Sequence, residues 1–216
     1  MGVAQGIDRP PWLRRALLRT GAAVAAVMLA ACATTRPPPA PESATPPPAW
    51  QGHRHALLAI GHWAINARVA VRKGNTGMSA LLRWAQDKDA YRVSIYGPFG
   101  QGAVQLHGDR DGGELRTSDD KTYRARNMQR LLYERLGWPI PVLGLRYWAR
   151  GLPVPDVATR FGFDDQGRLA WVEQFGWHVS YPGYRSVNGV ELPRRITIER
   201  DDLRVKLVID QWHIKT

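Results

Sequence analysis

Hydrophobic and polar residues alternate along most of the chain after residue 62. In the first such stretch, Trp63, Ile65 and Val69 lie on one side of an extended chain, while Arg68 and Arg72 lie on the other. An alternation with a period of two predicts a half-buried β-strand. The same pattern recurs, between turn sequences rich in Gly, Asp and Asn, around residues 78–85, 91–95, 103–106, 114–116, 122–124, 161, 169–172, 177–181, 194–200 and 203–212. We therefore expect about eleven strands.

Three segments have a helical spacing of apolar residues instead. The first lies within residues 51–60, where Leu57 and Leu58 should face inward together with Trp50. Asn127 is the expected cap of the second helix, and Gly137 should end it. A third, shorter helix should follow Pro141 and end before Gly151. The expected inward-facing residues of the two later helices are Met128, Leu131, Leu132, Leu136, Val142, Leu145, Trp148 and Ala149.

This order of elements predicts one mainly β domain with a helical insert. Many short strands at steady spacing favour a single large antiparallel sheet that curls or closes, and its inner face would be apolar. The amphipathic helices of the insert would cover the open side. A covered apolar cavity and a tightly filled core both fit this arrangement, because a residue that lines a cavity and a core residue give the same periodicity.

The N-terminal residues have the features of a bacterial lipoprotein signal. Arg14, Arg15 and Arg19 precede an apolar run, 21–31, which is shorter than the ~20 residues that span a bilayer. The run ends in Leu-Ala-Ala before Cys32, as in a lipobox. We expect residues 1–31 to be removed and Cys32 to be acylated. Ala33, where Asp would retain a lipoprotein at the inner membrane, indicates the outer membrane.

The residues that follow Cys32 predict a tether. Prolines at 37–39, 41 and 46–48 favour extended polyproline II over helix and sheet. We therefore divide the mature chain into an acylated, proline-rich tether, residues 32–49, and a folded domain, residues 50–216.

Composition narrows the classes of partner. The formal net charge is +11, and +8 remains once residues 1–31 are removed. A basic surface fits nucleic acid, an anionic membrane or an acidic protein. Because an exported lipoprotein does not meet nucleic acid routinely, headgroups or an acidic protein are the expected partners. A merely solvated basic surface is the alternative.

The chain has no recognisable catalytic or metal-binding motif. G-x-S-x-G, H-E-x-x-H and P-loop patterns are missing, and the single cysteine is assigned to the anchor. His53, His55 and His62 are close together but match no known metal-ligand spacing. Residues 109–113 fit a hairpin turn better than a calcium loop. We expect no enzymatic activity, metal or cofactor.

Several segments resemble the LolB family of outer-membrane lipoprotein receptors, in order and over nearly the whole mature domain. They are residues 83–86 (RWAQ), 96–100 (YGPFG), 137–141 (GWPIP), 145–148 (LRYW), 151–153 (GLP), 177–181 (WHVSY) and 205–212 (VKLVIDQW). The resemblance implies an incomplete antiparallel barrel with a helical lid over an apolar cavity. It also implies that lipoproteins are accepted from a periplasmic LolA-type carrier and inserted into the inner leaflet of the outer membrane without nucleotide.

The resemblance also suggests site residues. Cavity liners would be Leu82, Trp84, Leu131, Leu132 and Trp148, each of which fits an ordinary core position equally well. The membrane-insertion loop would be Gly97, Pro98, Phe99 and Gly100. Phe99 stands where the family exposes a leucine, and its alternative is to fold back onto the sheet. Candidates for docking an acidic carrier are Arg68, Arg83 and Arg146.

Three other functional classes stay open at this point. One is a structural lipoprotein that binds protein or peptidoglycan and has a filled core. A second is a lipoprotein enzyme, for which no residues are evident. The third is a LolA-like or glycolipid-binding carrier of the same fold, although a soluble carrier would lack Cys32. A monomer is expected in each case.

Overall fold

The computed structural model describes residues 45–97, 103–137 and 140–215, all within one compact unit. Three helices are present in this part of the chain: α2 (Pro48–Ala59), α3 (Met128–Leu136) and α4 (Val142–Trp148). The strands are β1 (His62–Lys73), β2 (Thr76–Asp87), β3 (Ala90–Tyr96), β4 (Ala103–Gly108), β5 (Gly113–Arg116), β6 (Thr122–Ala125), β7 (Arg160–Phe163), β8 (Leu169–Gln174), β9 (Trp177–Val187), β10 (Val190–Arg200) and β11 (Leu203–Lys215). The mainly β prediction with a helical insert is confirmed.

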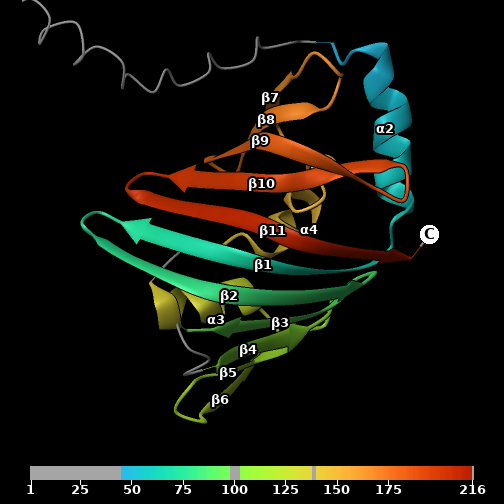
Figure 1. Cartoon of the computed structure of the whole chain (residues 1–216). Coiled ribbons are helices and arrows are strands. Elements are labelled where there is room, and N and C mark those ends of the chain that lie inside the picture. Colours follow the sequence, from blue (N-terminus) through green and yellow to red (C-terminus); the bar gives the residue numbers. More distant parts are fainter. Residues whose placement is uncertain (1–44, 98–102, 138–139, 216) are drawn as a thin grey trace, which may run out of the picture. The chain divides into compact units, whose positions relative to one another are not determined.

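All the strands belong to one antiparallel sheet, in the order β6-β5-β4-β3-β2-β1-β11-β10-β9-β8-β7 (Figure 1). Consecutive strands are neighbours, and β1 pairs with both β2 and β11. The order of pairing therefore follows the chain in a circle from β1 to β11 and back to β1, except that β6 and β7 are not paired. The chain between these two edge strands carries α3 and α4.

The antiparallel register defines two ends of the sheet. The β1–β2, β3–β4, β8–β9 and β10–β11 connections lie at one end, which we call the loop end. The β2–β3, β4–β5 and β9–β10 connections lie at the other, which we call the network end. In Figure 1 the loop end is on the left.

Two groups of buried side chains cover the inner face of the sheet. The main cluster joins α2 and α4 to β1, β2 and β7–β11, with Trp63, Ile65 and Trp148 among its members. The second cluster joins α3 to β4, β5 and β6 through Leu115 and Met128. Most of α4 thus packs on the main cluster and α3 on the second, while Val142 at the start of α4 packs against the second cluster as well.

The ends of α3 follow directly from the sequence. The Asn127 side chain accepts a hydrogen bond from the Arg130 amide at 2.9 Å, which satisfies one of the free N–H groups of the first turn. Gly137 ends the helix in the left-handed region, with φ 70°, and its amide donates to the Tyr133 carbonyl. Both predictions are confirmed.

Helix α2 differs from its prediction in its start, expected at Gln51, and in the burial of one residue. It begins at Pro48, where proline suits the first helical position because its missing N–H has no partner there. Trp50 and Leu57 are buried as expected, but Leu58 is 42% exposed. The expectation that Leu58 faces inward was wrong, because the helix buries one narrow stripe and the next residue turns about 100° away from it. No helix in the described residues is both long and apolar enough to cross a membrane.

The β9–β10 hairpin is longer than its pattern indicated. The strands run to Val187 and start again at Val190, so only Asn188 and Gly189 connect them. Both have positive φ, 50° and 79°, as a two-residue type I′ turn requires. The Asn-Gly pair was the available signal for this hairpin.

Candidate functional site

Helix α4 packs against the inner face of the sheet, within the main cluster. It has only seven residues, and its Trp148 side chain is fully buried in the main cluster. Leu145 and Tyr147 pack against the same cluster. Because so short a helix is not stable alone, its position depends on these apolar contacts and on polar contacts in and just after its C-terminal half.

Gln174 fastens the C-terminal end of α4 to β8. Its Oε1 accepts hydrogen bonds from Trp148 Nε1 at 3.1 Å and from the Val154 amide at 2.8 Å. Its Nε2 donates to the Val154 carbonyl at 2.9 Å and to Thr159 Oγ1 at 2.7 Å. Gln174 is 2% exposed, so its amide satisfies all four hydrogen bonds within the core.

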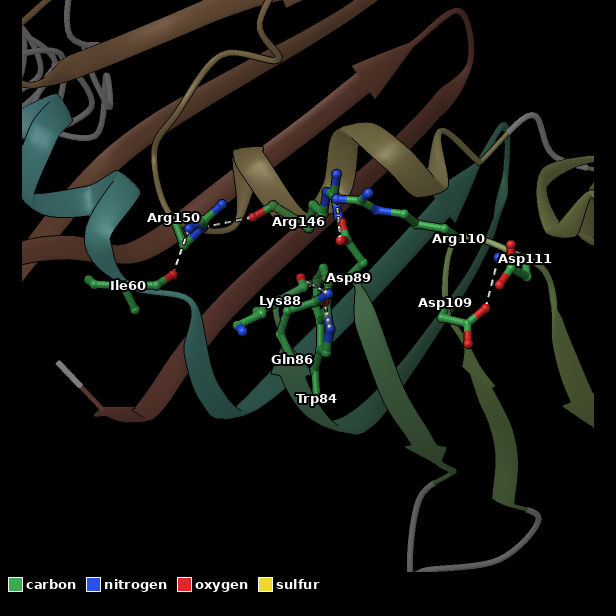
Figure 2. A network of polar contacts seen from close by, with 10 residues as sticks. All are labelled: Ile60, Trp84, Gln86, Lys88, Asp89, Asp109, Arg110, Asp111, Arg146 and Arg150. Carbon is green, nitrogen blue, oxygen red and sulfur yellow. Dashed lines mark hydrogen bonds and ion pairs between the residues drawn. The ribbon is translucent and has the colours of Figure 1, made fainter.

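Arg150 fastens the chain just after α4 to the segment between α2 and β1 (Figure 2). Its Nη1 donates to the carbonyls of Ile60 at 2.7 Å and Leu57 at 3.3 Å, and its Nε donates to the Arg146 carbonyl at 3.2 Å. The side chain is 8% exposed. Burial lowers the pKa of this guanidinium, whose charge is distributed over backbone carbonyls.

Asp89 connects α4 to the network end of the sheet through ion pairs. It lies in the β2–β3 connection, and its two oxygens contact Arg146 of α4 and Arg110 of the β4–β5 connection (Figure 2). The Arg146 and Asp89 side chains are only 23% and 25% exposed. Hydrogen bonds from Arg146 and then from Arg110 hold the pKa of Asp89 below its usual value.

A hollow of about 640 Å³ opens beside this ion pair. We call it the basic hollow, because four arginines line it together with two aspartates and several apolar side chains. Its lining residues are Asp89, Tyr91, Asp109, Arg110, Arg126, Asn127, Met128, Gln129, Arg130, Tyr133, Val142 and Arg146. It therefore lies between α3, α4 and the network end, and its charge suits an acidic surface.

The predicted cavity liners are divided between the two clusters. Trp84 and Trp148 belong to the main cluster, and Leu82 packs against it. Leu131 and Leu132 belong to the second cluster, on α3. The structure places all five on the inner side of the sheet, and their role as liners stays a prediction.

The predicted docking arginines do not come together. Arg68 and Arg83 lie on the outer face, where Arg68 contacts Asp210 at 2.9 Å and Arg83 lies over the Tyr96 ring at 5.6 Å. Arg146 lies on α4, at the basic hollow. One partner could not contact all three through a single small patch.

Four other predicted residues, Cys32, Pro98, Phe99 and Gly100, lie outside the described residues. Gly97 directly follows β3 at the loop end and is half-buried. Since Tyr96 pairs with Ala103, the predicted insertion loop starts and ends at the loop end.

Phe175 is an aromatic residue at the loop end that the sequence reasoning missed. It is 47% exposed in the β8–β9 turn, and its ring centroid lies 6.4 Å from that of Trp148. Its φ is 55°, and Gly176 follows with φ 74°. A bulky residue rarely adopts this conformation, because its Cβ crowds the backbone. The Phe-Gly pair between two strand patterns was the only signal.

The fold is similar to that of a solved relative. A LolA superfamily protein from Nitrosomonas europaea superposes with a TM-score of 0.51 at 8% identity, over 81% of this chain and 95% of the other. At that identity the likeness concerns the fold alone, and it agrees with an open curved sheet that carries helices on its inner side.

Sequence comparison identifies the family. The family model described as "Outer membrane lipoprotein LolB" matches residues 61–212. A protein of Pseudomonas putida named outer-membrane lipoprotein LolB is 38% identical over 163 residues, and one of Stutzerimonas stutzeri with the same name is 37% identical over 164. Each alignment covers 76% of this chain and 80% of the relative. The chain therefore belongs to the LolB family of outer-membrane lipoproteins.

Proposed function

We propose that this protein accepts acylated lipoproteins from a LolA-type periplasmic carrier and inserts them into the inner leaflet of the outer membrane, without nucleotide. The acyl chains would bind between α4 and the inner face of the sheet. The observation that carries this proposal is α4 itself. This seven-residue helix packs against the apolar main cluster, and side-chain contacts of Trp148 and Arg146 in its C-terminal half hold it there instead of sheet hydrogen bonds.

The energetics of acyl chains favour such a site. Burying an acyl chain yields ~0.8 kcal/mol per CH₂, so a chain of about fifteen methylenes resists exposure to water by roughly 12 kcal/mol. Passing the chain from one apolar site to another avoids that exposure. Direction then requires only a higher affinity in the receiving protein.

The membrane step belongs at the loop end. The predicted insertion loop, Gly97 to Gly100, begins there, and the exposed Phe175 ring lies at the same end. An acylated Cys32 and the proline-rich tether would keep the domain at the outer membrane. Exposed aromatic side chains suit the boundary between headgroups and acyl chains.

Phe99→Glu tests the role of the insertion loop. A carboxylate at the loop tip should leave the domain folded and able to accept lipoproteins, but should impair their delivery to membranes, since a charge resists entry into the bilayer. Delivery is measured as lipoprotein that co-sediments with liposomes. Normal delivery by this variant would refute the insertion role of Phe99.

A transfer assay tests the proposal as a whole. A LolA-type carrier loaded with a triacylated lipoprotein is mixed with the Cys32→Ser chain, which has no acyl group of its own, in the absence of ATP. The expected result is that the lipoprotein moves onto the chain, as seen by affinity pull-down. If it stays on a cognate carrier while the chain is folded, the proposal fails and a structural lipoprotein becomes the better account.

A further inference from the structure

In the described part of the chain, the buried hydroxyl of Tyr181 has no hydrogen-bond partner. Tyr181 lies on the inner face of β9 within the main cluster and is 5% exposed. Its hydroxyl makes no hydrogen bond to any described residue. The neighbouring Tyr184, with a ring centroid 6.0 Å away, donates its hydroxyl to the Leu169 carbonyl at 2.6 Å. Of two adjacent tyrosines, one is therefore used by the fold and the other is not.

Tyr184 of this pair lies close to the segment that directly follows α4, since a Cβ placed on Gly151 would stand 3.1 Å from the Tyr184 hydroxyl oxygen. Tyr181 belongs to the same buried cluster as Trp148 of α4. Its surroundings in the main cluster are apolar, as an acyl chain requires.

A second buried atom without a partner among the described residues lies on His53, whose ring is near that of Tyr184. The His53 ring is 6.3 Å from the Tyr184 ring, and its Nε2 lies 2.8 Å from the Glu191 carbonyl oxygen. Because a carbonyl can only accept, Nε2 carries the hydrogen. The buried His53 Nδ1 also has no hydrogen-bond partner among the described residues.

An unpartnered hydroxyl inside an apolar core is unfavourable, and phenylalanine would fill the same space without that penalty. Burial raises the pKa of Tyr181 well above its ordinary value, so the group keeps its proton and remains a donor. A donor in apolar surroundings binds an acceptor more strongly than it would in water. The hydroxyl is therefore suited to an acceptor that arrives with a ligand.

We propose that the Tyr181 hydroxyl donates a hydrogen bond to a carbonyl oxygen of the linkage that joins the acyl chains to the terminal cysteine of a bound lipoprotein. The inference rests on the proposed function. Acyl chains themselves offer only CH₂ and CH₃ groups, whereas the ester and amide linkages at their heads carry strong acceptors. Tyr181 thereby distinguishes an acylated protein from a bare hydrocarbon of the same size.

The test combines two variants with three synthetic peptides. Tyr181→Phe removes only the hydroxyl, and the matched control Tyr184→Phe removes a hydroxyl that the fold uses. The peptides carry a tripalmitoylated cysteine, the same cysteine with ether in place of ester linkages, or a dipalmitoylated cysteine without the N-acyl amide. Their binding to the Cys32→Ser chain is measured by displacement of bis-ANS, and the thermal unfolding midpoint is recorded for each variant.

Tyr181→Phe should weaken binding of the tripalmitoylated peptide about tenfold, the effect of one lost hydrogen bond. The loss should vanish with the ether peptide if the contact is an ester, or with the dipalmitoylated peptide if it is the amide. The unfolding midpoint should not fall. Tyr184→Phe should show the reverse, a lower midpoint with affinity retained.

Three results would overturn the inference. They are unchanged affinity in Tyr181→Phe, an equal loss for all three peptides, and a fall in the midpoint as large as that of Tyr184→Phe. If the chain with both tyrosines intact bound none of the peptides, the proposed function itself would fail.

Discussion

Phe175 occupies a backbone conformation that suits asparagine or glycine. Phe175→Asn would create an Asn-Gly pair, the preferred sequence for a type I′ turn. We expect the free energy of unfolding to rise by about 1 kcal/mol, because relief of the strain at φ 55° outweighs a half-exposed ring contact with Trp148. Urea unfolding measures the change.

The same variant separates stability from function at this residue. If Phe175 contacts lipid at the loop end, Phe175→Asn should deliver less lipoprotein to liposomes although it is more stable. A loss of stability would contradict the account of strain and would assign Phe175 to packing on Trp148.

Gln174 is a residue whose loss the core should not tolerate. Gln174→Leu would leave Trp148 Nε1 and both backbone polar groups of Val154 without their partners. Each unsatisfied buried group costs about 1–3 kcal/mol, so we expect a loss of at least about 3 kcal/mol in urea unfolding. The control is Gln105→Leu on the exposed face of β4, which should change stability by less than about 0.5 kcal/mol. Similar losses in both variants would contradict the role of Gln174.

At the scale of elements, the Asp89 contacts hold α4 against the network end. The pKa of Asp89 is lower in the folded protein than in the unfolded chain. The ion pairs therefore stabilise the fold fully above the unfolded pKa of about 4, and this contribution disappears as the pH falls through the lower folded value. The destabilisation caused by Asp89→Asn should consequently shrink below about pH 4.

The measurement is urea unfolding at a series of pH values for the natural chain and Asp89→Asn. Asp87→Asn is the matched control, since Asp87 at the end of β2 is 71% exposed and pairs with His62 instead of α4. If the two variants showed the same dependence of stability on pH, the contacts of Asp89 with Arg146 and Arg110 would not be the source of that dependence.

Patterns of short period predicted the elements and a single antiparallel sheet, but not the contacts that position α4. The alternation around residues 63–72 and the Asn127 and Gly137 signals are local, and each corresponds to an observed strand or helix end. The contacts that position α4 are not local. Arg150 contacts a carbonyl 90 residues earlier, and Arg146 contacts a carboxylate 57 residues earlier.

The same limit explains the site predictions. A residue type and its period could place Trp84 and Trp148 on an inner face, but not decide which helix covers which part of the sheet. Arg68, Arg83 and Arg146 all carry a positive charge. The first two lie on the outer face of the sheet, however, and Arg146 lies on α4 at the basic hollow. The pattern predicted one curled antiparallel sheet with the helices of the insert over its open side, and the resemblance to a family added that the barrel is incomplete and holds a cavity.

For the whole molecule, the net charge of +11 raises the question of whether a carrier meets a general basic surface or one particular place. We expect the basic hollow to be that place. Arg126→Glu reverses an exposed charge in the hollow, and Arg92→Glu reverses an exposed charge on the outer face of β3, so both variants have the same net charge.

With an acidic LolA-type carrier, association rates measured by stopped flow at about 0.05 M salt should fall several-fold for Arg126→Glu and little for Arg92→Glu. At about 0.5 M salt the difference should nearly vanish, because charges separated by more than a few ångströms are then screened. Equal rates for the two variants at low salt would show that net charge alone guides the encounter, and a rate that does not change with salt would rule out electrostatic steering altogether.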